Sequence, residues 1–147
     1  MKKILIVVVL ISTFSLYSQN KTIKGKVIDE YFEAVRGVSI VVNDTVIGET
    51  DANGVFKVDI LIDVKNILFE SLGLEPTRIE LTDYCNEIEV VVLLSGSYNF
   101  KSLKKVNRHR MRKFKMLSKL HKEAFLKGMF ITEKACYTQG FICSERM

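Results

Sequence analysis

The stretch that decides the fold is residues 38–60, which read VSIVVNDTVIGETDANGVFKVDI. Runs rich in β-branched residues are separated there by polar residues at 43–44 and 51–54. Asn and Asp tolerate the positive φ angles of tight hairpin turns, so the second run should return antiparallel to the first. The stretch predicts three short strands, at residues 38–43, 45–50 and 55–60.

The same pattern continues on both sides of this stretch. Four further runs of apolar residues lie between turn residues, at 22–29, 66–71, 77–81 and 87–94. Seven short strands at intervals of roughly 8–12 residues are typical of a β-sandwich, so we expect a mainly β fold. The residues expected on its inner faces are Ile23, Val27, Val38, Ile40, Val42, Phe56, Val58, Leu68, Ile79, Ile88, Val90 and Val92.

Four motifs in this region, in order along the chain, resemble those of the carboxypeptidase regulatory-like domain. They are IKGKVID at 23–29, VRGVSI at 35–40, GETDANGVF at 48–56 and ILFESLGL at 67–74. In the last motif Leu74 stands where the family usually has an aromatic residue. The resemblance covers residues 21–94. It implies a seven-stranded, transthyretin-like (prealbumin-like) sandwich over residues 20–94 that binds or supports rather than catalyses.

Domains of this family sit beside metallocarboxypeptidase domains and at the N-terminus of many TonB-dependent outer-membrane receptors. The 147 residues have no room for either neighbour. Because function lives in sites rather than in folds, the resemblance implies a binding or accessory role without naming a ligand.

The residues of the central turn have a structural and a functional interpretation. Gly48 and Gly54 suit turns or bulges that a Cβ would hinder, and Asp51 and Asn53 can bond their own loop in Asx turns. The D-x-N-G order also matches the opening of a calcium loop, but the later bidentate Glu is missing at the required spacing. We therefore expect structural turn residues, with no metal and no cofactor.

The first residues are typical of a secretory signal peptide. Lys2 and Lys3 precede an apolar run at 4–11 and a small polar segment, so we expect a signal peptide over residues 1–18. An uncleaved anchor or a buried strand is the alternative, but the apolar part is shorter than the ~20 residues of a membrane-crossing helix. No Cys follows the run, which argues against a lipoprotein. We expect a protein exported to the periplasm or outer membrane, or secreted.

Export permits disulfides, and the chain has three cysteines, Cys85, Cys136 and Cys143. An odd number leaves one thiol unpaired or pairing with another chain. A turn at 139–140 could join Cys136 to Cys143 across a small hairpin. The alternative is that these two are buried free thiols.

The charge distribution divides the chain into an acidic body and a basic tail. Residues 1–97 carry 9 Lys/Arg and 14 Asp/Glu, whereas residues 98–147 carry 13 and 3. We expect a hinge at 95–100 and a basic tail at 101–147, helical over 101–127 with a break at 107–110, where Arg110 interrupts the apolar stripe. The expected apolar face comprises Leu103, Val106, Phe114, Leu117, His121, Ala124 and Phe125.

Three interpretations of this helix remain open. Its apolar face could pack on the sandwich or on another copy, the helix could dock on an anionic membrane surface, or it could contact an acidic partner protein. Export argues against nucleic acid. The basic residues expected to contact a partner or lipid are Lys104, Lys105, Arg108, Arg112, Lys115 and Lys119.

Catalytic signatures are missing from the sequence. It has no G-x-S-x-G, no H-E-x-x-H, no phosphate loop and no zinc spacing. We therefore expect no enzyme, although a hydrolase using Cys136 or Cys143 with His121 is a weaker alternative. The leading expectation is a non-catalytic binding or accessory module of the bacterial cell envelope that engages an envelope protein. The alternative is a peripheral membrane-surface protein that binds anionic lipid through its tail.

Overall fold

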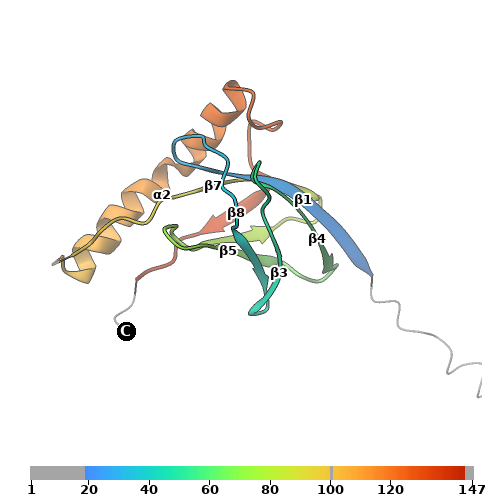
Figure 1. Cartoon of the computed structure of the whole chain (residues 1–147), viewed down its shortest axis with the longest axis horizontal. Coiled ribbons are helices and arrows are strands. Elements are labelled where there is room, and N and C mark those ends of the chain that lie inside the picture. Colours follow the sequence, from blue (N-terminus) through green and yellow to red (C-terminus); the bar gives the residue numbers. More distant parts are fainter. Residues whose placement is uncertain (1–18, 100, 145–147) are drawn as a thin grey trace, which may run out of the picture.

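A computed structural model describes residues 19–99 and 101–144, which form two β-sheets and one long helix (Figure 1). The expected signal peptide, residues 1–18, lies outside the described residues. The elements are β1 (Asn20–Asp29), β2 (Ser39–Val42), β3 (Thr45–Glu49), β4 (Val55–Leu61), β5 (Asn66–Glu70), β6 (Thr77–Leu81), β7 (Glu87–Val92), α2 (Leu103–Leu126) and β8 (Tyr137–Gly140). All seven predicted strands are present, whereas β8 was not predicted.

The strands form a three-stranded sheet in the order β4-β1-β7 and a five-stranded sheet in the order β3-β2-β5-β6-β8. β1 pairs antiparallel with β4 and parallel with β7, and every pairing in the larger sheet is antiparallel. The C-terminal strand β8 thus joins the larger sheet, beside β6. The polypeptide after the predicted sandwich is therefore part of the sheet structure and not a separate extension.

The main core lies between the two sheets, and eleven of the twelve predicted inner residues are buried there. The exception is Leu68, which is only half-buried. In β5 the residues that face the core are its neighbours Ile67 and Phe69, each 1% exposed. The prediction for Leu68 was wrong because three consecutive apolar residues hide the alternation that fixes which face of a strand is buried.

Strand β7 is buried on both faces, because α2 covers the face that points away from the main core. Residues 88–92 are all buried. Val91 and Leu93 form a second apolar cluster with Leu117, Ala124 and other residues of the tail. Figure 1 shows α2 lying along one side of the molecule, beside β7.

Candidate functional site

Helix α2 runs without interruption from Leu103 to Leu126, so the predicted break at 107–110 is wrong. Arg110 is tolerated in the buried stripe because its charge is compensated. Its Nε lies 2.6 Å from Glu75 Oε2, an ion-pair contact rather than an aligned hydrogen bond, and its Nη1 donates to Ser144 Oγ at 2.6 Å. A guanidinium with such partners can remain inside an interface.

The apolar face of α2 packs on the sandwich, which confirms the first of the three interpretations of the helix. Val106, Leu117 and Ala124 are buried, and Phe114 and Phe125 pack at the edge of the second cluster. A second ion pair, from Lys113 Nζ to Glu30 Oε1 at 2.7 Å, links the middle of the helix to the loop after β1. α2 is therefore held on the body at several points along its length.

The segment after α2 is anchored by a buried carboxylate. Glu89 of β7 accepts hydrogen bonds from Ile131 N at 2.6 Å, Thr132 N at 3.0 Å and Thr132 Oγ1 at 2.7 Å. Burial raises the pKa of the Tyr137 phenol, which stays protonated and donates to the Glu89 carbonyl at 2.8 Å. Glu89 alternates with apolar residues along β7, a pattern that is typical of a solvent-facing position, so the sequence gives no signal of this role.

A disulfide joins Cys85 to Cys136, with 5.4 Å between the Cα atoms, and Cys143 is free and exposed. The predicted Cys136–Cys143 pair is therefore wrong. Residues 137–140 form an extended strand and not a turn, so Cys136 and Cys143 lie at opposite ends of it and cannot approach within the ~4.4–6.8 Å between Cα atoms that a disulfide needs. Disulfides persist outside the cytoplasm, so the observed bond is consistent with export.

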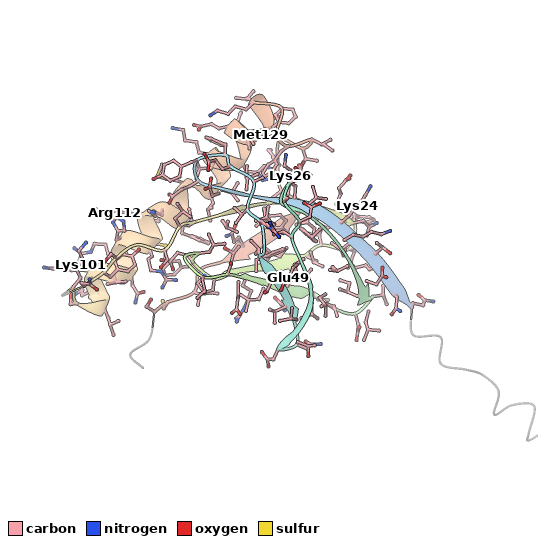
Figure 2. The ribbon with its side chains drawn as sticks, viewed as in Figure 1. Lys24, Lys26, Glu49, Lys101, Arg112 and Met129 are labelled. Carbon is pink, nitrogen blue, oxygen red and sulfur yellow. A yellow bond between two sulfur atoms is a disulfide. The ribbon has the colours of Figure 1, made fainter. Side chains whose placement is uncertain are left out.

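The six basic residues predicted to contact a partner are all exposed on α2. Each lies on the side of the helix opposite the buried stripe, as the position of Arg112 illustrates in Figure 2. Of these six residues, only Lys119 has an ion-pair partner within the described part of the chain, Glu123 at 3.6 Å. We call this surface the basic stripe, made of Lys104, Lys105, Arg108, Arg112, Lys115 and Lys119.

The basic stripe lowers the stability of the helix that carries it. Lys104 and Arg108, like Arg108 and Arg112, are four residues apart, a spacing at which like charges repel. The first turn holds no acidic residue, and Lys104 and Lys105 lie near the positive end of the helix dipole. Since folding does not benefit from this arrangement, the stripe is a candidate binding surface.

A hollow of about 360 Å³ lies in the N-terminal half of this surface. Its walls come from α2 and from Lys101 just before the helix, so cationic groups surround a space that is open to a partner's side chain. The residues that line it are Lys101, Lys105, Arg108, His109 and Arg112.

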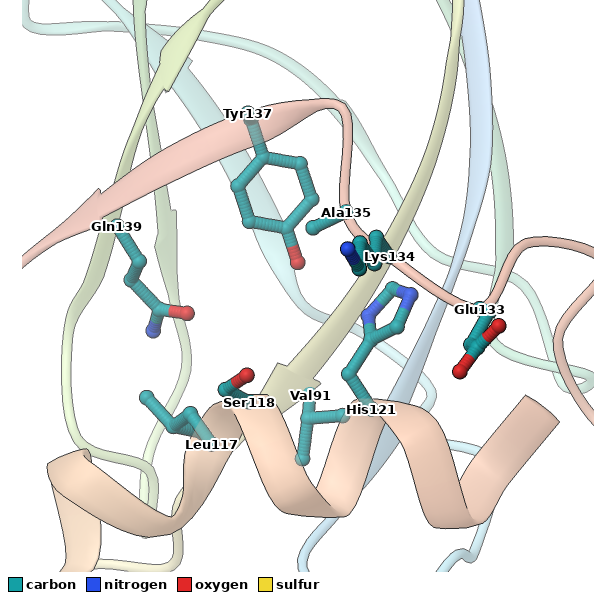
Figure 3. A pocket seen from close by; sticks show the side chains of 9 residues that line it. All are labelled: Val91, Leu117, Ser118, His121, Glu133, Lys134, Ala135, Tyr137 and Gln139. Carbon is teal, nitrogen blue, oxygen red and sulfur yellow. The ribbon is translucent and has the colours of Figure 1, made fainter. Parts of the chain in front are cut away.

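A second hollow, a cleft of about 280 Å³, lies between α2 and β8 (Figure 3). Tyr137 and Gln139 enter it from β8, and Ser118 and His121 enter it from α2. The Nε2 atom of His121 lies 3.1 Å from Thr132 O. Burial lowers the pKa of His121, against smaller opposing effects of Thr132 and Glu89, so the ring is neutral at neutral pH.

The weaker hydrolase alternative named Cys136 or Cys143 as the nucleophile, and the structure excludes Cys136. Cys136 is in the disulfide and has no thiol, and its Sγ lies 3.3 Å from the Glu87 carbonyl. His121 contacts Thr132 O and the ring of Phe130, whose centroid is 4.8 Å from that of the imidazole. Nothing in these contacts orients the histidine toward a nucleophile.

The central turn residues have the structural roles that the sequence predicted. Asp51 Oδ1 accepts hydrogen bonds from Asn53 N at 2.8 Å and Val55 N at 2.9 Å, and Gly54 adopts φ +71°. A Cβ at Gly48 would lie 2.6 Å from the Val58 side chain, beside a β-bulge between β2 and β3. Within residues 19–99 and 101–144, no group of three or more His, Cys, Asp or Glu could hold a metal ion.

Within the same residues, no helix is long and apolar enough to cross a membrane. A comparison of the chain with models of known protein families and with curated proteins finds no match.

Proposed function

We propose that this protein is an exported, non-catalytic binding module of the bacterial cell envelope, which engages an acidic surface of an envelope protein through the basic stripe of α2. The signal-peptide pattern and the Cys85–Cys136 disulfide support export. Four ordered motifs and two facing sheets support a carboxypeptidase regulatory-like domain of the transthyretin-like type.

The observation that carries the proposal is the exposed stripe itself. Six cations lie along one side of a helix that is held by its opposite side, and five of them have no ion-pair partner among the described residues. An acidic partner would gain complementary charge along the length of α2 without reorganising the helix. Complementary charge of this kind raises the rate of association and selects among partners.

A protein partner is favoured over a lipid surface by the burial of the apolar side of α2. Amphipathic helices bind membranes by burying their apolar face among the lipids and adding electrostatic attraction. Here Leu117 and Ala124 are occupied in the contact with the sandwich, and Val106 is buried as well. Only the electrostatic part is left for a lipid, and it weakens as salt rises.

The test is capture of envelope proteins by the tagged mature chain after gentle cross-linking. We expect a discrete protein to be captured by the wild type and lost with Arg108→Glu/Arg112→Glu. Arg36→Glu/Lys57→Glu reverses the same number of exposed charges on the sandwich and should capture it normally. Equal capture by both variants, or no specific protein with the wild type, would contradict the proposal.

The lipid alternative is tested on the same three proteins with vesicles that contain phosphatidylglycerol. We expect weak association of the wild type that disappears at physiological salt. The lipid alternative would be correct if the wild type sediments with these vesicles at physiological salt, Arg108→Glu/Arg112→Glu does not, and no protein is captured. The partner of the basic stripe would then be the membrane surface and not an envelope protein.

A further inference from the structure

The larger sheet ends at β8, and one edge of this strand has no strand neighbour among the described residues. From this edge and the charges around the adjacent cleft, we propose that an extended, acidic segment of the protein partner binds beside β8 as an additional strand of the sheet. This inference rests on the proposed function, because the same envelope partner supplies the segment. It adds a second contact beside the basic stripe, with which it shares only Lys115.

The direction of the main-chain groups of β8 follows from its pairing with β6. Leu81 N donates to Lys65 O on the β5 side, so the main-chain groups of Leu81 point away from β8. Leu81 lies opposite Tyr137, which makes this a non-hydrogen-bonded pair. The N–H and C=O groups of Tyr137, and of Gln139 two residues later, therefore point to the free edge. No hydrogen bond among the described residues engages them.

The side chains of the same two residues face the cleft beneath this edge. Tyr137 and Gln139 point from β8 toward α2, where Ser118 and His121 form the opposite wall (Figure 3). A strand added beside β8 would continue the sheet over this cleft, and every second side chain would point into it. The cleft volume of about 280 Å³ has room for one or two side chains. Strand addition combines main-chain hydrogen bonds with side-chain pockets in this way.

The charges around the cleft favour an acidic segment. Lys115 and Lys122 are neighbours of Ser118 on the helix surface, three and four residues away, and Lys134 lines the cleft from the segment before β8. The acids at this site are Glu133, which is paired with Lys122 at 3.0 Å, and Glu89, whose buried carboxylate acts on His121 and Tyr137. Three lysines against two glutamates leave an excess of one positive charge around the cleft, so carboxylates of an incoming segment would be attracted.

The position of β8 is fixed, which prepares this edge for a partner. Cys136, directly before the strand, is joined to Cys85, and its carbonyl accepts a hydrogen bond from Thr82 Oγ1 at 2.6 Å. Tyr137 is held by the Glu89 carbonyl. An edge that is ordered before binding loses little conformational entropy when a partner strand pairs with it.

The experiment uses the full mature chain and a fluorescent peptide of about eight residues that alternates Glu and Val, a length that suits a single strand. We expect saturable binding by anisotropy and shifts of the Tyr137 and Gln139 amide signals by NMR. The matched peptide that alternates Lys and Val should bind about tenfold more weakly or not at all. Equal binding of both peptides, or amide shifts confined to the basic stripe, would overturn the proposal.

Two changes test the edge itself. Gln139→Pro removes the outward N–H without removing a bond to β6, and should weaken Glu-Val binding about tenfold. Thr138→Val, whose side chain is exposed outside the cleft, should bind normally. If the proline variant does not fold, the wild type is tested with two Glu-Val peptides, one N-methylated at the odd-numbered amides and the other at the even-numbered amides. Because only alternate amides of an added strand face β8, only one of the two peptides should lose binding. Equal loss with both peptides contradicts strand addition.

The stripe variant separates this inference from the proposed function. Arg108→Glu/Arg112→Glu should still bind the Glu-Val peptide, with amide shifts at Tyr137 and Gln139, while it fails to capture the envelope protein. A chain that captures the protein through the stripe but does not bind the peptide at β8 leaves the proposed function standing and overturns the additional strand.

Discussion

Arg110 of α2 and Glu75, between β5 and β6, form an ion pair across the contact of helix and sandwich, with 2.6 Å between Arg110 Nε and Glu75 Oε2. The two side chains are 8% and 12% exposed. A charge that looks misplaced in the helical pattern is thus paired with a charge on the body. The pair fixes the position and the rotation of α2 on the sandwich, and thereby keeps the outer side of the helix facing solvent.

Removing one member of this pair should destabilise the protein strongly. Glu75→Leu leaves a buried guanidinium without its counterion, and we expect a loss of about 3–5 kcal/mol in the free energy of unfolding. The double variant Glu75→Leu/Arg110→Met, which removes both charges, should recover most of that loss. Urea denaturation of the three proteins measures both effects. A single variant within about 1 kcal/mol of the wild type would show that the pair is solvated.

The disulfide should make a large contribution to stability. Its cysteines are 51 residues apart, and closing a loop of that length restricts the unfolded chain by about 4 kcal/mol in the chain-entropy model. Cys85→Ala/Cys136→Ala should lose about that amount, whereas Cys143→Ser should have no effect. Alkylation of the unreduced protein followed by mass spectrometry should modify one thiol, at Cys143. Modification of Cys85 would contradict the observed pairing.

The buried carboxylate of Glu89 should be needed to hold residues 131–132. Glu89→Gln replaces an acceptor of three hydrogen bonds by an amide whose NH₂ group cannot accept them, and we expect a loss of about 2–3 kcal/mol. Hydrogen exchange of the Ile131 and Thr132 amides should accelerate by more than global destabilisation explains. Glu87→Gln removes an exposed pair with Lys24 and serves as the control, with unchanged exchange at these amides.

Stability should fall in mild acid because of His121. Burial lowers its pKa in the folded protein below the ordinary value of 6.5, so the unfolded chain takes up the proton first. The contribution of the neutral His121 ring to the free energy of unfolding is therefore fully present above pH 6.5 and decreases as the pH falls below that value. His121→Gln should have a flatter profile of unfolding free energy between pH 7 and 5 than the wild type, whereas exposed His109→Gln should match the wild type. Parallel profiles for all three proteins would contradict this assignment.

The sequence predicted the strands of the body because each alternates, or clusters apolar residues, between turn residues. It failed where this signal is degenerate, as in β5, where Ile67, Leu68 and Phe69 are all apolar and only packing selects the buried face. The same limitation hid the second buried face of β7, since Val91, and Leu93 just after the strand, fit either a solvated or a covered face.

The candidate site was predicted only in part. The basic stripe follows from helical periodicity, which places its six residues on one side of the helix whatever the opposite side contacts. Strand β8 could not be predicted, because its four residues YTQG have a weak strand pattern and gain their partner from β6, more than 50 residues earlier. The disulfide and the cleft depend on that pairing, so they were missed with it.

The central claim is that the basic stripe is the surface that contacts an envelope protein. The most direct measurement places a photo-cross-linking amino acid at Arg112 in growing cells, and separately at Lys57 on the exposed side of β4. Our account predicts a single protein adduct from position 112 and none from position 57. Equal adducts from both positions, or lipid as the only species cross-linked at position 112, would contradict it.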